Sequence, residues 1–291
     1  MRLTRCGILL AIAAATAHAE VTTFQNGVKP TPAYAGCQDT WISGEKWEQG
    51  RDYGQRPTLR CGGQRHILIR FDLGAIPKGH VVHRAVLDLA DVGYPRQRQG
   101  KWPVTMLARR LTRAWQDDAN WLEHTRTDYK AEDAGDWATP GGELDRETDF
   151  GRDERGLIAS DTTGFDGRAH LHRLDVTRVV QAWHGGTLPN HGIALAAPPK
   201  SHGCQVASSE WNVPDCRPRL IVAHGPKGRR PAPIRPLPSV PEAIELLSAP
   251  AGVIKPRGDY AVTRVGQNDN CTLRGASTDA YVKEAALRYP G

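Results

Sequence analysis

A strict alternation of apolar and polar side chains is the feature that most restricts the fold of this chain. Between residues 66 and 73, every second residue is apolar: Ile67, Ile69, Phe71 and Leu73. A period of two places successive side chains on opposite faces of a β-strand, so these four face one side. Leu68 is apolar on the opposite side. This predicts that the outer face of the strand is partly covered.

Other short strands are predicted at residues 82–90, 103–109, 192–197 and 219–223, separated by Gly, Pro and Asn turns. One helix interrupts them, because four apolar residues recur at positions i, i+3, i+4 and i+7: Val176, Val179, Val180 and Trp183. Asp175 or Thr177 is the candidate N-cap, and Gly185-Gly186 is the stop. Many short strands with one short helix predict an all-β antiparallel sandwich rather than a parallel sheet.

Composition divides the 291 residues into four parts. Residues 1–19 combine a basic start, an apolar run and Ala17-His18-Ala19 before Glu20, a pattern typical of a cleaved signal peptide; an uncleaved anchor is the alternative. Residues 20–224 hold the predicted sandwich. Residues 225–241 are rich in Pro and Arg and predict a semi-rigid linker, and residues 242–291 predict a small or partly disordered extension. We therefore expect a secreted chain, extracellular or periplasmic, without a membrane span.

Charge is partitioned within the predicted sandwich. Residues 51–113 contain thirteen basic and four acidic residues, whereas residues 114–166 contain five basic and fifteen acidic residues. Such asymmetry is typical of a surface that binds a charged partner, but two opposite blocks can also pair with each other in the fold. Residues 20–224 carry 26 charges of each sign, so, with export, a nucleic-acid partner is not expected.

Cysteine usage fits an exported chain, in which disulfides are permitted. Five cysteines follow residue 19, and four of them lie near predicted strand ends. Three connectivities are open for four cysteines. We predict Cys37–Cys61 and Cys204–Cys216, each of which closes a short loop. Cys271 is then free or paired with another chain.

Several short motifs occur in a consistent order through residues 21–224. They are Asp39-Thr40-Trp41, Asp52-Tyr53-Gly54, Arg70-Phe71-Asp72-Leu73, Ile76-Pro77, Trp115 with Trp121, Gly141-Gly142-Glu143, Asp175-Val176-Thr177, Trp183 with Gly186, Asn190 with Gly192, Ser208 with Glu210, and Arg217-Pro218. In this order and spacing the chain resembles the DNRLRE-type domains, carbohydrate-binding module family 96. The resemblance implies a jelly-roll sandwich that binds an acidic, alginate-like polysaccharide. The acidic insert at residues 123–170 and the C-terminal extension depart from the family pattern.

Sugar binding requires flat apolar surfaces and planar polar groups, which aromatic and arginine side chains supply. The loop at residues 93–103 combines both kinds of side chain, and Trp47 stands beside Lys46 in another polar segment. We therefore predict that a uronate is bound by Tyr94, Arg96, Arg98, Lys101, Trp102 and Trp47. The alternatives are a solvated basic loop and ordinary, partly buried aromatic residues.

A structural calcium ion is a second expectation, because jelly-roll sugar modules often hold one and an exported protein meets calcium. Calcium prefers six to eight oxygen ligands. Asp39, Asp52 and Glu210 are the acidic residues next to strands that are expected to pair. They are the predicted calcium ligands; no D-x-D-x-D-G loop is present.

Three functions remain open, and a non-catalytic carbohydrate-binding module is the first. The second is a structural or adhesion protein of the cell envelope that uses its Pro/Arg-rich tail or Cys271 for contact. The third is a lyase or hydrolase acting on uronate polymers. His170, His172 and Tyr53 supply suitable residue types for it, but their spacing does not define a catalytic constellation. No catalytic residue is therefore assigned.

Overall fold

The computed structural model describes residues 20–92, 104–126, 135–163, 171–199 and 201–228, and the strand residues 253–254, 262–265 and 272–275. The signal-peptide prediction therefore lies outside the described residues. The elements are β1 (Glu20–Phe24), β2 (Cys37–Ser43), β3 (Thr58–Cys61), β4 (Arg65–Phe71), β5 (His80–Ala90), β6 (Val104–Arg110), β7 (Leu157–Thr163), β8 (Leu171–Asp175), α1 (Thr177–His184), β9 (Ile193–Ala196), β10 (Cys204–Ala207) and β11 (Arg219–Pro226). The strands β12 (Val253–Ile254), β13 (Val262–Val265) and β14 (Thr272–Gly275) form a separate antiparallel sheet.

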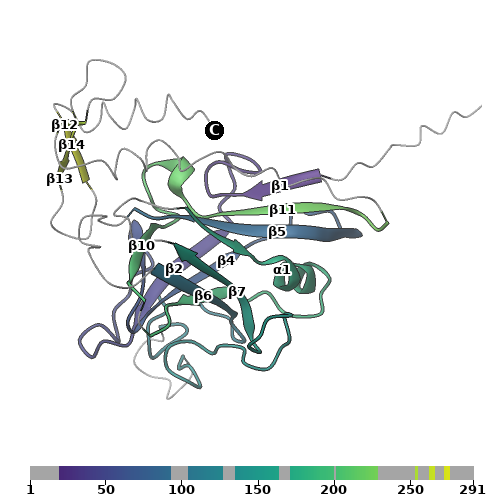
Figure 1. Cartoon of the computed structure of the whole chain (residues 1–291), viewed down its shortest axis with the longest axis horizontal. Coiled ribbons are helices and arrows are strands. Elements are labelled where there is room, and N and C mark those ends of the chain that lie inside the picture. Colours follow the sequence, from purple (N-terminus) through teal and green to yellow (C-terminus); the bar gives the residue numbers. More distant parts are fainter. Residues whose placement is uncertain are drawn as a thin grey trace, which may run out of the picture.

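Two antiparallel sheets form the body of the fold, and one lies over the other in Figure 1. The first has the strand order β1-β11-β5-β8, and the second has the order β2-β4-β9-β6-β7. Without β2, the eight strands of these sheets number 1-8-3-6 and 2-7-4-5 in chain order. This is the arrangement of a jelly roll, two Greek keys wound together. The prediction of an all-β, jelly-roll-like antiparallel sandwich is confirmed.

The core lies between the two sheets and is built by the alternation seen in the sequence. Ile67 and Ile69 of β4 pack in one buried cluster with Leu87 and Leu89 of β5. Helix α1 covers an end of this core with Val179, Val180 and Trp183, all buried, as its spacing predicts. The prediction of Asp175 or Thr177 as the N-cap is wrong, because the N-cap is Val176, which makes no side-chain cap hydrogen bond. The Asp175 carboxylate accepts a hydrogen bond from the Thr177 backbone N–H at 3.0 Å.

The outer face of the five-stranded sheet carries a second apolar cluster. Leu68 and Ala194 lie there beside Trp115 and Trp137, which belong to the segment between β6 and β7. Trp115 is 1% exposed, and its indole N–H donates to the His191 carbonyl at 2.8 Å. The segment after β6 therefore covers the outer face of β4. This confirms the prediction, made from Leu68, that this face is partly covered.

Several strands of the fold were not predicted, namely β1, β3, β7 and β10. Strand β7 lies within the acidic insert and forms the edge of the five-stranded sheet. Strands β3 and β10 pair as a separate two-stranded sheet, although about 140 residues separate them. Strand β11 also continues to Pro226, two residues past the predicted end of the sandwich. Among the described residues, no helix is long and apolar enough to cross a membrane.

The predicted disulfides Cys37–Cys61 and Cys204–Cys216 are wrong, because all four cysteines are free, buried thiols. The pairing of β3 with β10 places Cys61 opposite Cys204 rather than beside Cys37. Cys37 instead pairs in register with Phe71 of β4. Cys216 ends a short 3₁₀ turn that precedes β11. Cys271 lies outside the described residues.

Candidate functional site

A polar pocket of about 560 Å³ opens where the N-terminal end of β2 meets the C-terminal end of β4. Its lining is rich in carboxylates and side-chain amides, with one guanidinium from Arg70. The polar side chains that line it are Gln38, Asp39, Arg70, Asp72, Gln116, Asp117, Asn190, Ser209 and Glu210. With four carboxylates against one guanidinium, the pocket favours a cation or a neutral polar ligand over an anion.

Asp39 is the most constrained carboxylate of this pocket, at 2% exposure. Its Oδ2 accepts a hydrogen bond from the Ser209 backbone N–H at 2.9 Å and lies 3.6 Å from the Cys37 thiol. Its Oδ1 is buried without a hydrogen-bond partner. Burial, and then the negative charge of Glu210, raises the pKa of Asp39 well above its usual range. Neutralisation of Asp39 by a proton or a bound cation therefore favours the folded protein.

Two of the three predicted calcium ligands, Asp39 and Glu210, line this pocket. Asp52 is not in the lining, and its carboxylate accepts the Gly54 backbone N–H at 2.8 Å in the turn after residue 51. Asp72 and Asp117 line the pocket in its place and were not predicted as ligands. Asp72 follows the last residue of β4. Its position at the end of a strand with alternating side chains is the sequence signal that could have identified it as a pocket residue.

Cys37 also lines the pocket, but its chemistry is not that of a nucleophile. Burial, followed by the neighbouring charge of Asp39, raises the pKa of the Cys37 thiol well above its usual range. The thiolate is the reactive form of cysteine, so this thiol remains protonated and unreactive.

A second surface lies on the segment that connects β2 with β3. Trp47 is 64% exposed, the highest value among the large hydrophobic residues that the structure describes. The Arg51 guanidinium lies 5.4 Å from the centre of the Trp47 ring. Lys46, Arg51 and Arg56 are also exposed. We refer to Lys46, Trp47, Arg51 and Arg56 together as the Trp47 surface.

The Trp47 surface rests on a rigid aromatic base. Trp41 and Tyr53 stack with their ring centres 3.7 Å apart, and the Arg60 guanidinium lies 5.1 Å from the Trp41 ring. Glu48 is buried, and its carboxylate pairs with Arg65 at 2.9 Å. Burial, and then the nearby positive charge of Arg65, lowers the pKa of Arg60. Residues 45–65 contain five basic and three acidic residues, and this excess of positive charge favours an anionic partner.

Of the six predicted sugar-binding residues, only Trp47 belongs to the part of the chain that the structure describes. Trp47 is exposed as the prediction requires. Tyr94, Arg96, Arg98, Lys101 and Trp102 lie outside the described residues. Arg51 and Arg56 were not singled out from the sequence, although Arg51 follows Trp47 at a spacing of four.

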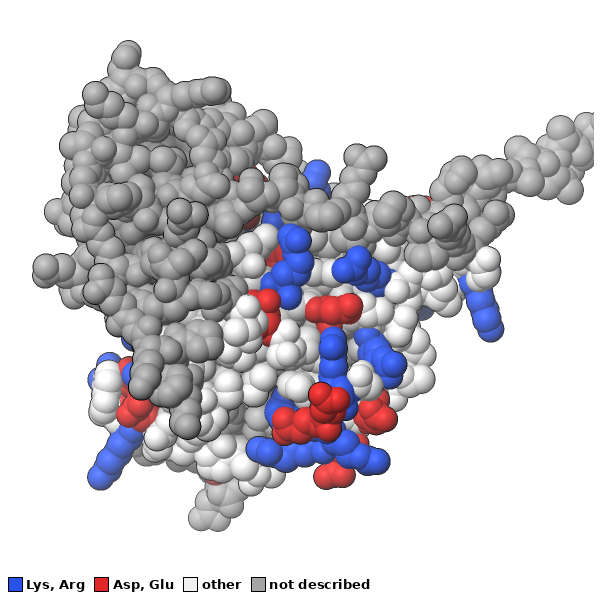
Figure 2. Space-filling view, in the orientation of Figure 1, with Lys and Arg blue, Asp and Glu red and all other residues white. Residues whose placement is uncertain are grey.

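The two opposite charge blocks pair with each other in part. Arg109, Arg110 and Arg113 come from the basic block around β6, and each forms an ion pair with a carboxylate of the acidic insert: Glu154, Asp145 and Glu143, respectively. In Figure 2, acidic and basic side chains are interspersed on the described part of the visible face. In its described residues, the insert therefore neutralises three neighbouring arginines of the basic block.

His172, a candidate from the sequence, is a core residue rather than a surface base. It is 0% exposed, and its Nδ1 lies 2.9 Å from the Asp161 carboxylate. Its pKa is raised well above the usual range: burial lowers it, but hydrogen bonds with Asp161 and Asp91 outweigh burial. His172 therefore links β8 to β7 as a buried charged pair. His170 lies outside the described residues.

No known family model matches the chain, and no curated protein matches it either.

Proposed function

We propose that this chain is a non-catalytic carbohydrate-binding module that binds an acidic polysaccharide through the Trp47 surface. The observation that carries the proposal is the 64% exposure of Trp47 beside the Arg51 guanidinium. Burying an exposed indole against a pyranose ring removes apolar area from water, and the indole loses little conformational entropy. A guanidinium beside the ring is placed to bond both oxygens of a uronate carboxylate.

The rest of the chain is compatible with this role. A jelly-roll sandwich supplies a rigid support for a binding loop, and the stacked Trp41 and Tyr53 rings fix the base of that loop. The resemblance to DNRLRE-type modules points to the same ligand class. Export is part of the proposal, since residues 1–19 have the pattern of a signal peptide. Mass spectrometry of the secreted protein should then find Glu20 as the first residue.

The test is calorimetric titration of the protein with alginate, polygalacturonate and a neutral glucan, with and without EDTA. Saturable binding to a uronate polymer that is lost in Trp47→Ala and weakened in Arg51→Ala supports the proposal. Leu122→Ala and Arg84→Ala are matched controls, because both side chains are exposed and lie outside the Trp47 surface. Equal losses in the controls, or no binding to any polymer, would refute it.

The absence of binding would instead favour the envelope-adhesion function. In that case, removal of residues 229–291 should abolish attachment to an anionic surface, whereas a sugar module should keep its ligand. The cut belongs after residue 228 because β11 continues to Pro226 and is paired with β5 along its whole length.

A hydrolase acting on a polysaccharide is the second candidate, and one observation favours it. Asp39 and Glu210 line one polar pocket, and the pKa of Asp39 is raised by burial and then by Glu210. Glycoside hydrolysis requires two carboxyl groups, one of which has a raised pKa and donates a proton. Release of reducing ends without unsaturated product during the same titration, abolished by Glu210→Gln, would support a hydrolase over a module. Unsaturated product would instead indicate a lyase.

A further inference from the structure

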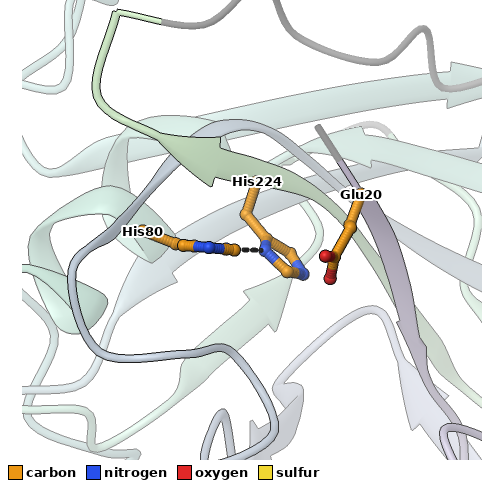
Figure 3. Close-up of side chains that lie close together, drawn as sticks. All are labelled: Glu20, His80 and His224. Atoms are coloured by element: carbon orange, nitrogen blue, oxygen red, sulfur yellow. Dashed lines mark hydrogen bonds between the residues drawn. The ribbon is translucent and has the colours of Figure 1, made fainter. Parts of the chain in front are cut away.

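Three strands bring two histidines and a glutamate together at one end of the four-stranded sheet. Glu20 of β1 is directly opposite His224 of β11 in the register. His80 of β5 is opposite Pro226, two residues beyond His224 on the same strand. Residues two apart on a strand share a face, so His80 is a diagonal neighbour of His224. In Figure 3, the His224 ring lies between the His80 ring and the Glu20 carboxylate.

The imidazoles present nitrogen atoms to each other. The Nδ1 atoms of His80 and His224 are 2.9 Å apart. One ligand atom from each of Glu20, His80 and His224 lies within 4.8 Å of the other two. Within the described ranges, no other group of three or more His, Cys, Asp or Glu side chains comes this close.

The neighbouring residues hold His224 in an orientation suited to a metal ligand. Its Nε2 lies 2.8 Å from the Thr22 hydroxyl. In the tautomer with the proton on Nε2, Thr22 accepts that proton and the lone pair of Nδ1 points at His80. Histidines that bind metals commonly donate their second ring N–H to such an acceptor, which fixes the tautomer and the ring.

A β-bulge in β11 lies next to His224 and affects the direction of its side chain. The register between β11 and β5 shifts between Ala223 and His224, and such bulges turn a side chain away from its regular direction. His184, in the last turn of α1, bonds through Nε2 to the His80 carbonyl at 3.0 Å. The two imidazoles are thus held by strand β1 on one side and by helix α1 on the other.

The three side chains also match in chemistry, since Glu20 supplies a carboxylate beside the imidazoles of His80 and His224. A neutral imidazole is the form that coordinates a metal, and the glutamate supplies negative charge to balance the ion.

We propose that Glu20, His80 and His224 bind a divalent transition-metal ion, with Zn²⁺ as the best match. Two imidazole nitrogens and one carboxylate form a common ligand set for zinc, and a water molecule completes the tetrahedron. At bond lengths of about 2.0–2.1 Å, tetrahedral nitrogen ligands are separated by about 3.3 Å. The Nδ1 atoms therefore need to separate by only a few tenths of an ångström. Glu20 is exposed, so its carboxylate can turn toward them.

The experiment is a titration of the EDTA-treated, dialysed mature protein, residues 20–291, with ZnCl₂, followed by calorimetry and thermal unfolding, with MgCl₂ and CaCl₂ as comparison ions. We expect one Zn²⁺ per chain, a melting temperature that rises with zinc concentration, and reversal by EDTA. Loss of a residue that only orients a ligand typically lowers metal affinity about 10–100-fold, so His80→Ala and Glu20→Gln should each lower it at least tenfold.

The variants separate loss of the site from loss of the fold. His80 is half-buried and Glu20 is exposed, so both variants should melt like the wild type in EDTA. His191→Ala is the control for adventitious binding to a histidine elsewhere. Three results would each overturn the proposal: no stoichiometric zinc binding by the wild type, unchanged affinity in His80→Ala or Glu20→Gln, or an equal loss in His191→Ala.

Discussion

The Arg110 guanidinium lies 2.8 Å from the Asp145 carboxylate, and the two side chains are only 9% and 4% exposed. Arg110 is the last residue of β6, and Asp145 belongs to the acidic insert. The same carboxylate accepts the backbone N–H groups of Glu147 and Thr148 at 2.9 and 3.0 Å. This buried ion pair thus anchors the insert to the end of β6, in addition to the pairing of β7 with β6.

Asp145→Ala should lower the free energy of unfolding by about 3–5 kcal/mol, because it leaves the Arg110 charge buried without a partner. Arg113→Ala is the matched control, since the Arg113–Glu143 pair is much more exposed and should contribute no more than about 1 kcal/mol. Denaturant unfolding at neutral pH measures both. A smaller loss in Asp145→Ala than in Arg113→Ala would contradict the anchoring role.

Stability should depend on Asp145 at acid pH. Burial raises the pKa of Asp145, but hydrogen bonds from Thr148, Glu147 and Arg110 outweigh burial and lower it to about 2. A lowered pKa in the folded state means that the contribution is present above pH 4 and is lost as the pH falls toward 2. The contribution is about 1–2 kcal/mol. The difference in unfolding free energy between wild type and Asp145→Asn should therefore become smaller as the pH falls from 5 to 2. A difference that stays constant over this range would contradict a lowered pKa of Asp145.

Trp47 and Trp115 should respond to substitution in opposite ways. Trp47→Ala should abolish polysaccharide binding and leave the unfolding free energy almost unchanged, because the side chain is 64% exposed. Trp115→Ala should destabilise the fold by about 3–5 kcal/mol, because it empties a buried site and removes the bond to His191. Calorimetric binding and denaturant unfolding of the two variants provide the comparison. A large stability loss in Trp47→Ala would show that its loop is part of the core.

Calcium and protons should compete at Asp39. Its pKa is raised in the folded state by burial and then by Glu210, so its stabilising contribution is present below its unfolded pKa and is lost as the pH rises. Asp39→Asn should therefore stabilise the calcium-free protein at neutral pH. Calcium at millimolar concentration should raise the melting temperature of the wild type but not that of Asp39→Asn. Asp52→Asn should keep the rise in melting temperature with calcium. If this rise were lost in Asp52→Asn, the calcium ion would lie near residue 52 instead.

Much of the fold could be predicted because its signals are local. Alternation defined β4 and β5, and helical spacing with glycine at its end defined α1, within one or two residues. Strand β7 was missed because its sequence, LIASDTT, has few apolar residues and lies in an acidic, Gly-rich segment. Its strand conformation comes from pairing with β6, where Ala108 lies opposite Ala159.

The sites were less predictable than the strands. Trp47 could be singled out from its polar neighbours, but Trp41 and Trp137 have polar neighbours as well and are buried at 3% and 4% exposure. Whether such a side chain is covered depends on segments far away in the sequence. For the same reason, Asp39 and Glu210 meet in one pocket and Asp52 does not.

The sequence by itself determined which faces of the strands are apolar, where the helix begins and ends, and that the strands form an antiparallel sandwich. These properties depend on side-chain period and local backbone preference. Only the tertiary structure decided which distant strands are neighbours. It placed Cys61 opposite Cys204, and Glu20 opposite His224 across about 200 residues. Such pairings form because both sheets bury their apolar faces in one core. This burial is cooperative and depends on the whole domain, so no short stretch of the sequence specifies it.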